Sequence, residues 1–502
     1  MTSDDTPAPF LFEDGRNSWH TATADRFAVV IDACRYFQVA REAMLKAEKR
    51  IMLVGWDFDA RIKLRGGPLE PGEPETVGEF ILWLVERTPG LEVYLLRWDM
   101  GAIKSLFRGR TIVTLLRWMK HPRIHTKLDG KHPTGASHHQ KIVVIDDKFT
   151  FCGGIDMTSD RWDDRDHADG NPLRVRPNGT PHPPWHDATS AMSGPITTEF
   201  GNLVRHRWAL AGGKPIEPVT GGADCWPDSL EPDFADVRVA IARTHPLMPD
   251  VEEVREIEQL YLDMIACAQR RIYAESQYFA SRKIAEAIAA RLREPNGPEI
   301  VLINPLTANG WLEPIAMDTA RARLFETLRR LDVHKRFRIY HPFTAGGEAI
   351  YVHAKVMIVD EHMLRVGSSN MNNRSLRLDT ECDVAVDLRA DRDDPRCARI
   401  GAIQHSLVAE HLGVDPELVA NRIAETGSLI ETIESLRGEG RSLRPYEIPD
   451  LSGVETWLAD NEILDPEGPG EMFEGLSKRG LFRRARAWRS DRKQRRSRHL
   501  HR

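Results

Sequence analysis

Apolar positions along most of the chain follow helical and strand periods in alternation, and the same order of elements occurs twice. In the first half the spacing predicts helices over residues 28–49, 76–87 and 111–120, and strands over 50–56, 91–96 and around 124. In the second half it predicts helices over 251–269, 282–292 and 320–331, and strands over 271–276, 299–304 and 337–340. Such alternation indicates helices on both faces of a sheet with mixed strand directions. We therefore expect an α/β fold made of two similar units.

Segments without this periodicity suggest the domain boundaries. The start of the chain is polar, a central stretch is rich in Gly and Pro, and the final residues are basic. The expected parts are a flexible arm (1–25), a first repeat (26–211), a linker (212–250), a second repeat (251–415), an appendage (416–477) and a basic tail (478–502). Within the first repeat, residues 158–195 form a long non-periodic segment, which is typical of a functional loop or of disorder.

One short motif lies at the same place in both units. The first copy contains His139, Lys141, Asp146 and Gly153; the second copy contains His353, Lys355, Asp360 and Gly367 with identical spacing. Side chains alternate between the two faces of a strand, so each histidine shares a face with its lysine while the aspartate points to the other face. We count both aspartates in the catalytic motif and expect them to serve the scaffold.

These paired motifs resemble those of the phospholipase D superfamily. The segments 153–163, 184–187, 274–279 and 409–413 further resemble the branch that cleaves phospholipids, and the resemblance covers most of residues 26–415. It implies two fused α/β/α repeats with mixed sheets, related by a pseudo-twofold axis, with the active site at their interface. One chain would then hold a complete site without forming an oligomer.

Two histidines and two lysines that face one cavity suit a phosphodiester substrate. The lysines supply fixed positive charge for the phosphoryl oxygens, and histidine serves as nucleophile or proton donor near neutral pH. Further donors are expected from Ser368, Asn370 and the backbone near Gly153 and Gly367. This set requires no metal ion or other cofactor.

The resemblance also implies roles for single residues. His139 would attack phosphorus to give a phosphohistidine, and His353 would protonate the departing alcohol, although the sequence alone does not distinguish the two histidines. An imidazole in such a role needs a carboxylate on its second nitrogen, and the resemblance points to Glu381 and Asp163. The alternative for both acids is a surface ion pair; the apolar neighbours of Glu381 favour the functional interpretation.

Four more residues are candidates for substrate binding. Trp185 and His186 are expected at the rim of the site, while Glu275 and Gln277 either line the pocket or cap the end of a strand. The acidic residues around His167 lack the spacing of an EF-hand, so we expect a solvated acidic loop there and no metal site.

Charge and composition narrow the functional classes. The last 25 residues hold 12 Lys or Arg and one acidic residue, a formal charge of +11. Because the net charge of the whole chain is −6, the preceding 477 residues carry −17. A nuclease should have a basic body to meet backbone phosphates, so we expect no nucleic acid partner. The basic tail, which includes Leu481, Phe482 and Trp488, is expected either to contact anionic membranes or to be a disordered, solvated end.

The location of the protein is expected to be cytoplasmic or peripheral to a membrane. The N-terminus lacks the pattern of a secretory signal, no apolar run approaches the roughly 20 residues that span a bilayer, and secretion by a signal-independent route remains open. The six cysteines lack paired spacing, which favours reduced thiols.

The leading hypothesis is an enzyme that hydrolyses phospholipids such as phosphatidylcholine to phosphatidate and the headgroup alcohol, with transfer to a second alcohol as an added activity. The alternatives are a phosphatidyltransferase like the cardiolipin synthases, a nuclease of the same superfamily, and a non-enzymatic membrane scaffold. The intact histidines and lysines of both motifs argue against the scaffold.

Overall fold

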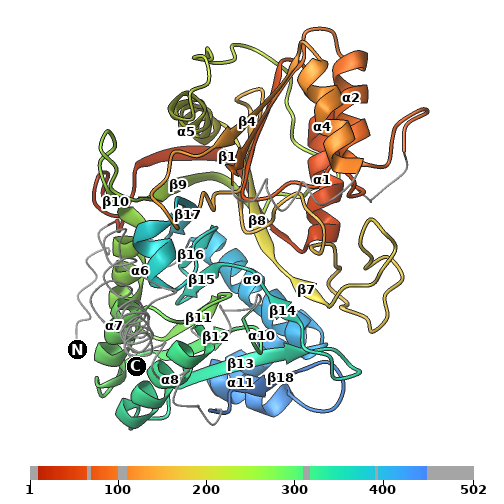
Figure 1. The fold of residues 1–502 in the computed structure, drawn as a ribbon. Coiled ribbons are helices and arrows are strands. Elements are labelled where there is room, and N and C mark those ends of the chain that lie inside the picture. Colours follow the sequence, from red (N-terminus) through yellow and green to blue (C-terminus); the bar gives the residue numbers. More distant parts are fainter. Residues whose placement is uncertain (1–9, 65–68, 100–109, 309–316, 391–393, 449–502) are drawn as a thin grey trace, which may run out of the picture.

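One large mixed sheet runs through both halves of the chain in the computed structural model, with helices on its two faces (Figure 1). The structure describes residues 10–64, 69–99, 110–308, 317–390 and 394–448. The expected α/β class and two-repeat arrangement are confirmed. The two units share one continuous sheet.

Within the described residues, the first unit contributes seven strands to the large sheet. From the outer edge inwards they are β4 (Ile124–Asp129), β3 (Glu92–Trp98), β2 (Arg50–Gly55), β5 (Ile142–Ile145), β6 (Phe149–Gly153), β8 (Ala188–Ser193) and β1 (His20–Ile31). β2, β3 and β4 run parallel, and the pairs from β2–β5 inwards are antiparallel.

The second unit repeats this order. From the outer side inwards its strands are β13 (Phe337–Phe343), β12 (Glu299–Ile303), β11 (Arg271–Glu275), β15 (Val356–Val359), β16 (Met363–Gly367), β17 (Glu381–Asp387) and β9 (Phe234–His245). β18 (Ser442–Pro445) extends the edge beyond β13, and the short β10 (Val254–Arg255) pairs with β9. The two motif strands, β5 and β15, therefore hold equivalent positions.

The units join where β1 pairs with β9 in antiparallel fashion, with Arg26 opposite Ala235. Antiparallel pairing of two equivalent strands is what a twofold relation between the units produces. This pairing corrects two expectations: the arm over 1–25 already contains the first half of β1, and the linker over 212–250 contains β9.

The helices follow the apolar spacing of the sequence. α1 (Ala33–Leu45) buries Tyr36, Phe37, Ala40 and Met44 on one stripe. It begins later than the expected residue 28, because residues 28–31 belong to β1. The other two outer helices of the first unit are α2 (Val77–Arg87) and α4 (Arg110–Lys120), and those of the second unit are α6 (Glu256–Cys267), α7 (Arg282–Leu292) and α8 (Thr319–Leu331).

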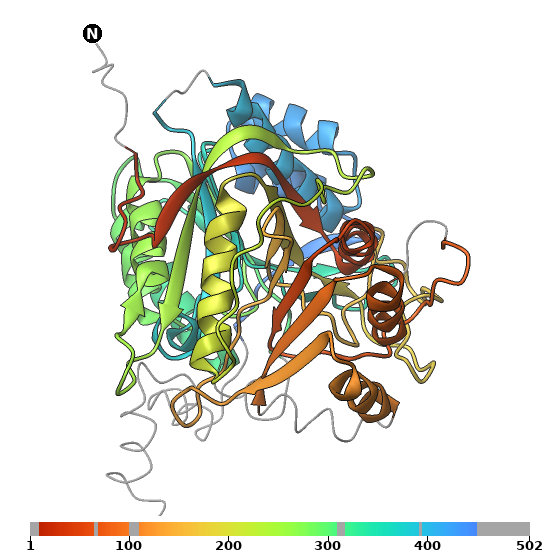
Figure 2. The same cartoon turned by 90° about the horizontal axis from the view of Figure 1, so that it is seen from above.

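Each unit has a hydrophobic core of its own. A further core lies between the units and holds them together. It combines side chains of both motif strands, such as Val144 and Val356, with residues of four helices. These helices are α5 (Ile196–Leu210), α9 (Pro395–Leu412), α10 (Pro416–Thr426) and α11 (Leu429–Leu436). Figure 2 shows α5 beside β1. Because this core is shared, residues that both units bring to their junction are held on a rigid base.

The expected appendage is partly integral to the fold. α10 and α11 bury Val419 and Ile433 in the shared core, and β18 pairs with β13. The tail over 478–502 lies outside the described residues. Among the helices that the structure describes, none combines the length and apolar character needed to cross a bilayer.

Candidate active site

The two motif histidines lie close together at the junction of the units. The ring centroids of His139 and His353 are 6.3 Å apart, and their planes form an angle of 64°. His139 Nδ1 lies 3.0 Å from both carboxylate oxygens of Glu381, and His353 Nδ1 lies 2.7 Å from Asp187 Oδ2. With Nδ1 donating to a carboxylate, Nε2 of each ring is the nitrogen available for chemistry.

Each carboxylate comes from the unit opposite its histidine. Glu381 is the first residue of β17 in the second unit, and Asp187 immediately precedes β8 in the first unit. The main chain repeats this exchange: the N–H of His139 donates to the carbonyl of Thr380, and the N–H of His353 donates to that of His186. Neither unit alone can orient its own histidine.

Asp163 was expected to orient a catalytic histidine, and this expectation is wrong: the acid that contacts His353 is Asp187. Asp163 accepts hydrogen bonds from His167 Nδ1, from Arg174 and from the main-chain N–H of Trp185, so it holds the loop that leads to Asp187. Both acids lie in the long segment 158–195. Only the pairing of β7 (Trp185–His186) with β14 (Tyr351–Val352) determines which one reaches His353.

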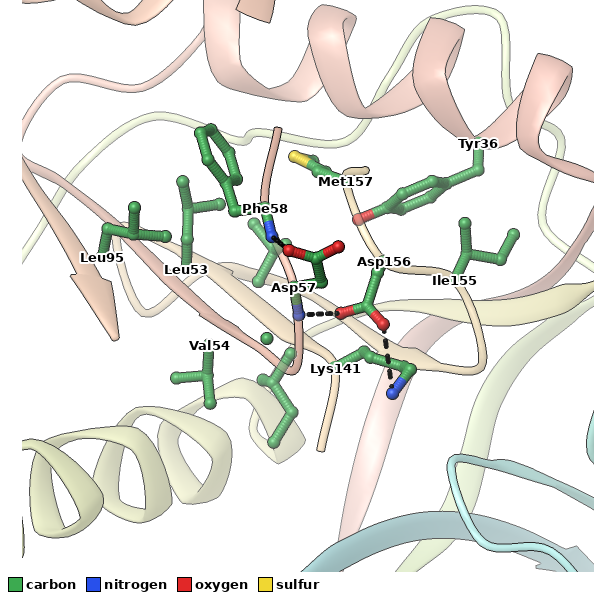
Figure 3. A pocket seen from close by; sticks show the side chains of 13 residues that line it. Tyr36, Leu53, Val54, Asp57, Phe58, Leu95, Lys141, Ile155, Asp156 and Met157 are labelled. Carbon is green, nitrogen blue, oxygen red and sulfur yellow. Dashed lines mark hydrogen bonds and ion pairs between the residues drawn. The ribbon is translucent and has the colours of Figure 1, made fainter. Parts of the chain in front are cut away.

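The two lysines lie in different surroundings. Lys141 Nζ donates to the carbonyl of His139 and lies 3.2 Å from Asp156 Oδ2 (Figure 3). Lys355 Nζ donates to the carbonyl of His353, and no ion pair joins it to an acid among the described side chains. Asn370 takes the place in the second motif that Asp156 has in the first. Burial lowers the pKa of Lys355 to about 7, and Asp187 opposes this shift.

Burial also governs the charge of the histidines and of Glu381. It holds the pKa of His139 and that of His353 well below 6.5, and the nearby motif lysines add to the effect. Burial raises the pKa of Glu381 to about 8, against the influence of Lys141. Both imidazoles are therefore neutral near pH 7, which is the form that a nitrogen nucleophile needs.

The expected phosphate donors are mostly used inside the protein. Ser368 Oγ donates to Glu381 Oε2 at 2.5 Å, so it supports the carboxylate instead of facing the substrate. The N–H of Gly153 donates to the carbonyl of Lys141, and that of Gly367 donates to Lys355. A Cβ at Gly153 would lie 2.4 Å from Thr189 Cα, so glycine is needed for close strand packing. Asn370 Nδ2 reaches Gln277 Oε1 at 3.4 Å.

The motif aspartates do not contact the site. Asp146 accepts hydrogen bonds from three successive main-chain N–H groups at the start of β2, those of residues 48–50. Asp360 does the same for residues 269–271 at the start of β11. Their place in the catalytic set is therefore wrong, whereas the scaffold role expected from strand parity agrees with the structure.

Of the four residues expected to bind substrate, Trp185 and Gln277 lie beside the site. The ring of Trp185 lies 5.2 Å from that of His353 and stacks on Tyr351, whose hydroxyl accepts from Gln277 Nε2 at 2.8 Å. His186 and Glu275 are instead buried and bonded to each other at 2.9 Å. The placement of His186 at the rim is wrong, and Glu275, the last residue of β11, fits the alternative of packing at the end of a strand.

Sequence reasoning missed three residues near the lysines and histidines. Asp156 follows the first motif glycine by three residues, and Asp187 lies in the segment 184–187, so both were within recognised stretches. Arg161 lies with its guanidinium 4.3 Å from the centre of the Trp185 ring and helps to lower the pKa of His353. On the other side of the site, the Trp56 ring lies 6.5 Å from His139.

Comparisons with known proteins agree with this geometry. A family model described as "Phospholipase D" matches residues 43–221, and one described as "Cardiolipin synthase, PLD-like domain" matches residues 261–393. The chain belongs to the phospholipase D superfamily.

Individual relatives are distant. The chain is 23% identical to phospholipase D alpha 1 of Arabidopsis thaliana over 74% of its own length, and 25% identical to that of Ricinus communis over 76%. It spans 63% and 64% of these two proteins. Among solved structures, phosphatidylserine synthase of Haemophilus influenzae Rd KW20 aligns with a TM-score of 0.50 at 13% identity, covering 83% of this chain and 96% of that one. This last likeness concerns the fold.

Proposed function

We propose that the protein is a phospholipase D-type phosphodiesterase that hydrolyses phospholipids to phosphatidate and a headgroup alcohol through a phosphohistidine. The observation that carries the proposal is the pair of imidazoles whose ring centroids lie 6.3 Å apart, each bonded to a carboxylate of the opposite unit. In the proposed reaction one phosphoryl group lies between the two Nε2 atoms.

In the first step, His139 Nε2 attacks phosphorus while the bond from phosphorus to the headgroup oxygen breaks. His353 donates its Nε2 proton to the departing alcohol. The pKa of His353 lies well below 6.5 without substrate, and the negative charge of a bound phosphodiester raises it because opposite charges favour the protonated form. Substrate binding therefore prepares His353 to act as the acid.

In the second step, the neutral His353 takes a proton from water, whose oxygen attacks phosphorus and displaces His139. The nucleophile leaves as a neutral imidazole, with Glu381 holding its Nδ1 proton. If an alcohol takes the place of water, the same step transfers the phosphatidyl group. The lysines, held by the carbonyls of their own motif histidines, stabilise the equatorial phosphoryl oxygens in both steps.

A lipid substrate is supported by the relatives that are named phospholipase D and by the −17 charge of the chain before its basic tail. The match of residues 261–393 to a cardiolipin synthase-like domain favours phosphatidyl transfer as the second candidate. Transfer and hydrolysis share the first step and differ only in the acceptor.

The test measures headgroup release from phosphatidylcholine vesicles, with plasmid DNA as a parallel substrate. We expect repeated choline release by the wild type, none by His139→Ala, and no more than one choline per enzyme from His353→Ala, in which the covalent intermediate is not hydrolysed. Adding phosphatidylglycerol or a primary alcohol as acceptor separates the two candidates, because a transferase forms the exchanged lipid in preference to phosphatidate. Turnover of DNA without turnover of lipid would contradict the proposal.

A further inference from the structure

A second group of ionisable side chains lies behind His353, where it takes no part in the reaction proposed above. It consists of Asp32, His167 and His186 from the first unit and Glu410 from α9 in the second, all buried. Each contributes one nitrogen or oxygen atom, and these four atoms all lie within 4.8 Å of one another.

The spacing of these atoms suits an ion at their centre. His186 Nδ1 lies 2.7 Å from Glu410 Oε1. His167 Nε2 lies 3.1 Å from the same glutamate oxygen and 3.7 Å from Asp32 Oδ2. Ligands at tetrahedral Zn²⁺ bond lengths are about 3.3 Å apart, and these three distances fall on both sides of that value.

The second nitrogen of each histidine is bound as metal-ligating histidines require. His167 Nδ1 lies 3.0 Å from Asp163, and His186 Nε2 lies 2.9 Å from Glu275. Carboxylate partners of this kind fix the tautomer and the ring orientation of ligating histidines. Both histidines thus direct the opposite nitrogen, Nε2 in one and Nδ1 in the other, towards the same point.

The remaining carboxylate oxygens are already engaged. Glu410 Oε2 lies 2.5 Å from Arg165 Nε, and Asp32 Oδ1 accepts the main-chain N–H of Asp187 at 3.0 Å. In contrast, Asp32 Oδ2 is buried and makes no hydrogen bond with the described residues. Buried polar atoms without a hydrogen-bond partner are uncommon in proteins, and this oxygen lies 3.7 Å from His167 Nε2.

We propose that Asp32, His167, His186 and Glu410 bind one divalent transition-metal ion, with Zn²⁺ the best fit to two nitrogens and two oxygens in a small buried site. The ion joins the two units through Glu410. It also fixes the main chain that carries Asp187, because the carbonyl of His186 accepts the N–H of His353. The ion is therefore structural and positions the acid–base histidine. The expectation of a solvated acidic loop is wrong for Asp163 and His167, which are buried.

The first test is the zinc content of the full-length protein, purified without chelators and without a histidine tag. Mass spectrometry of the metal should find one Zn²⁺ per chain, and His167→Gln and Glu410→Gln should each lose it. His341→Gln is the matched control: His341 is also buried and bonds the carbonyl of Asn304. Replacement of His499 and His501 in the basic tail should leave the zinc content unchanged.

Asp163→Asn tests whether Asp163 orients His167 for binding the ion, and the readout is the affinity for Zn²⁺. The substitution leaves the four ligands intact but should weaken Zn²⁺ binding about 10–100-fold, in competition with a chelator, because it removes the partner of His167. In the wild type, removal of the ion should lower the midpoint of thermal unfolding and its return should restore it. If the ligand variants fail to fold, X-ray absorption by the wild type loaded with Zn²⁺ decides, and should show two imidazoles and two oxygen ligands.

Two results would overturn the proposal. One is a folded wild-type protein that contains no zinc and gains neither bound Zn²⁺ nor thermal stability on titration; the group is then a network of protonated histidines and carboxylates. The other is a folded His167→Gln or Glu410→Gln variant that keeps its full zinc content, or an absorption spectrum with a different ligand set.

Discussion

His139 of the first unit and Glu381 of the second are joined by contacts of 3.0 Å from Nδ1 to each carboxylate oxygen. The same relation holds in reverse between His353 of the second unit and Asp187 of the first, at 2.7 Å. The two pairs exchange partners across the junction where β1 meets β9. A productive site therefore depends on the register between the units as well as on the motifs themselves.

Removing either carboxylate should reduce activity with little change in substrate binding. For Glu381→Gln and Asp187→Asn we expect kcat to fall by about 10²–10⁴-fold, because each loses the group that orients a histidine for proton transfer or attack. Steady-state kinetics on phosphatidylcholine vesicles provide the measurement. Asp166→Asn, an exposed acid of the same loop as Asp187, is the control and should behave as wild type. Normal kcat in Asp187→Asn would show that His353 needs no partner.

The pH dependence should report the asymmetry between the lysines. Lys355 has a pKa of about 7 in the free enzyme, so its positive charge is present below that pH and is lost as the pH rises through it. We expect kcat/KM to decline above about pH 7 for this reason. The decline in kcat should come at higher pH, because the bound phosphodiester anion raises the pKa of Lys355.

Asn370→Asp tests the origin of that decline. It places a carboxylate where the first motif has Asp156, which lies 3.2 Å from Lys141. A nearby negative charge favours the protonated lysine, so the alkaline limb of kcat/KM should move to higher pH. Asn370→Ser is the uncharged control and should leave the limb in place. A limb that stays at the same pH in Asn370→Asp would assign it to another group.

The motif aspartates should matter for stability and not for chemistry. Asp146→Ala leaves three main-chain N–H groups of residues 48–50 without their acceptor. We expect the free energy of unfolding to fall by about 2–4 kcal/mol, measured by urea denaturation, while kcat of the folded fraction changes little. Asp250→Ala, an exposed acid, should stay within about 0.5 kcal/mol of wild type. A full loss of kcat in well-folded Asp146→Ala would return this residue to the catalytic set.

Deleting residues 478–502 should weaken binding to anionic vesicles at low salt, because the deleted tail carries a formal +11. Vesicle co-sedimentation at two salt concentrations measures the effect. Hydrolysis of a short-chain soluble phospholipid serves as the control and should be unaffected by the deletion. Vesicle binding that is the same with and without the tail would refute a membrane contact by this segment.

Much of the fold could be predicted because the periodicity of the chain is strong. α7 was expected over 282–292 and spans Arg282–Leu292. β1 and β9 were missed, since segments such as Thr21–Asp25 alternate small and polar residues and become strands only when the two units pair. The continuous sheet is a consequence of that pairing, which no local pattern encodes.

The residue types and spacing of the motifs were sufficient to predict His139, Lys141, His353 and Lys355 as site residues. Residues whose position depends on a tertiary contact were not predicted. Asp163 and Asp187 are both acids of one loop, and only the β7–β14 pairing selects Asp187. His186 looked like a rim residue because it follows Trp185 among prolines, yet it is buried through contacts with the other unit.

The central claim is a covalent intermediate on His139 that His353 helps to form and resolve. It is tested most directly by rapid quenching with a phospholipid radiolabelled in its phosphatidyl part. Because water attack needs His353 as the base, His353→Ala should accumulate label on the protein, with the acid lability of a phosphohistidine, while His139→Ala should retain none. Label retained only when His139 is missing would contradict the account and make His353 the nucleophile.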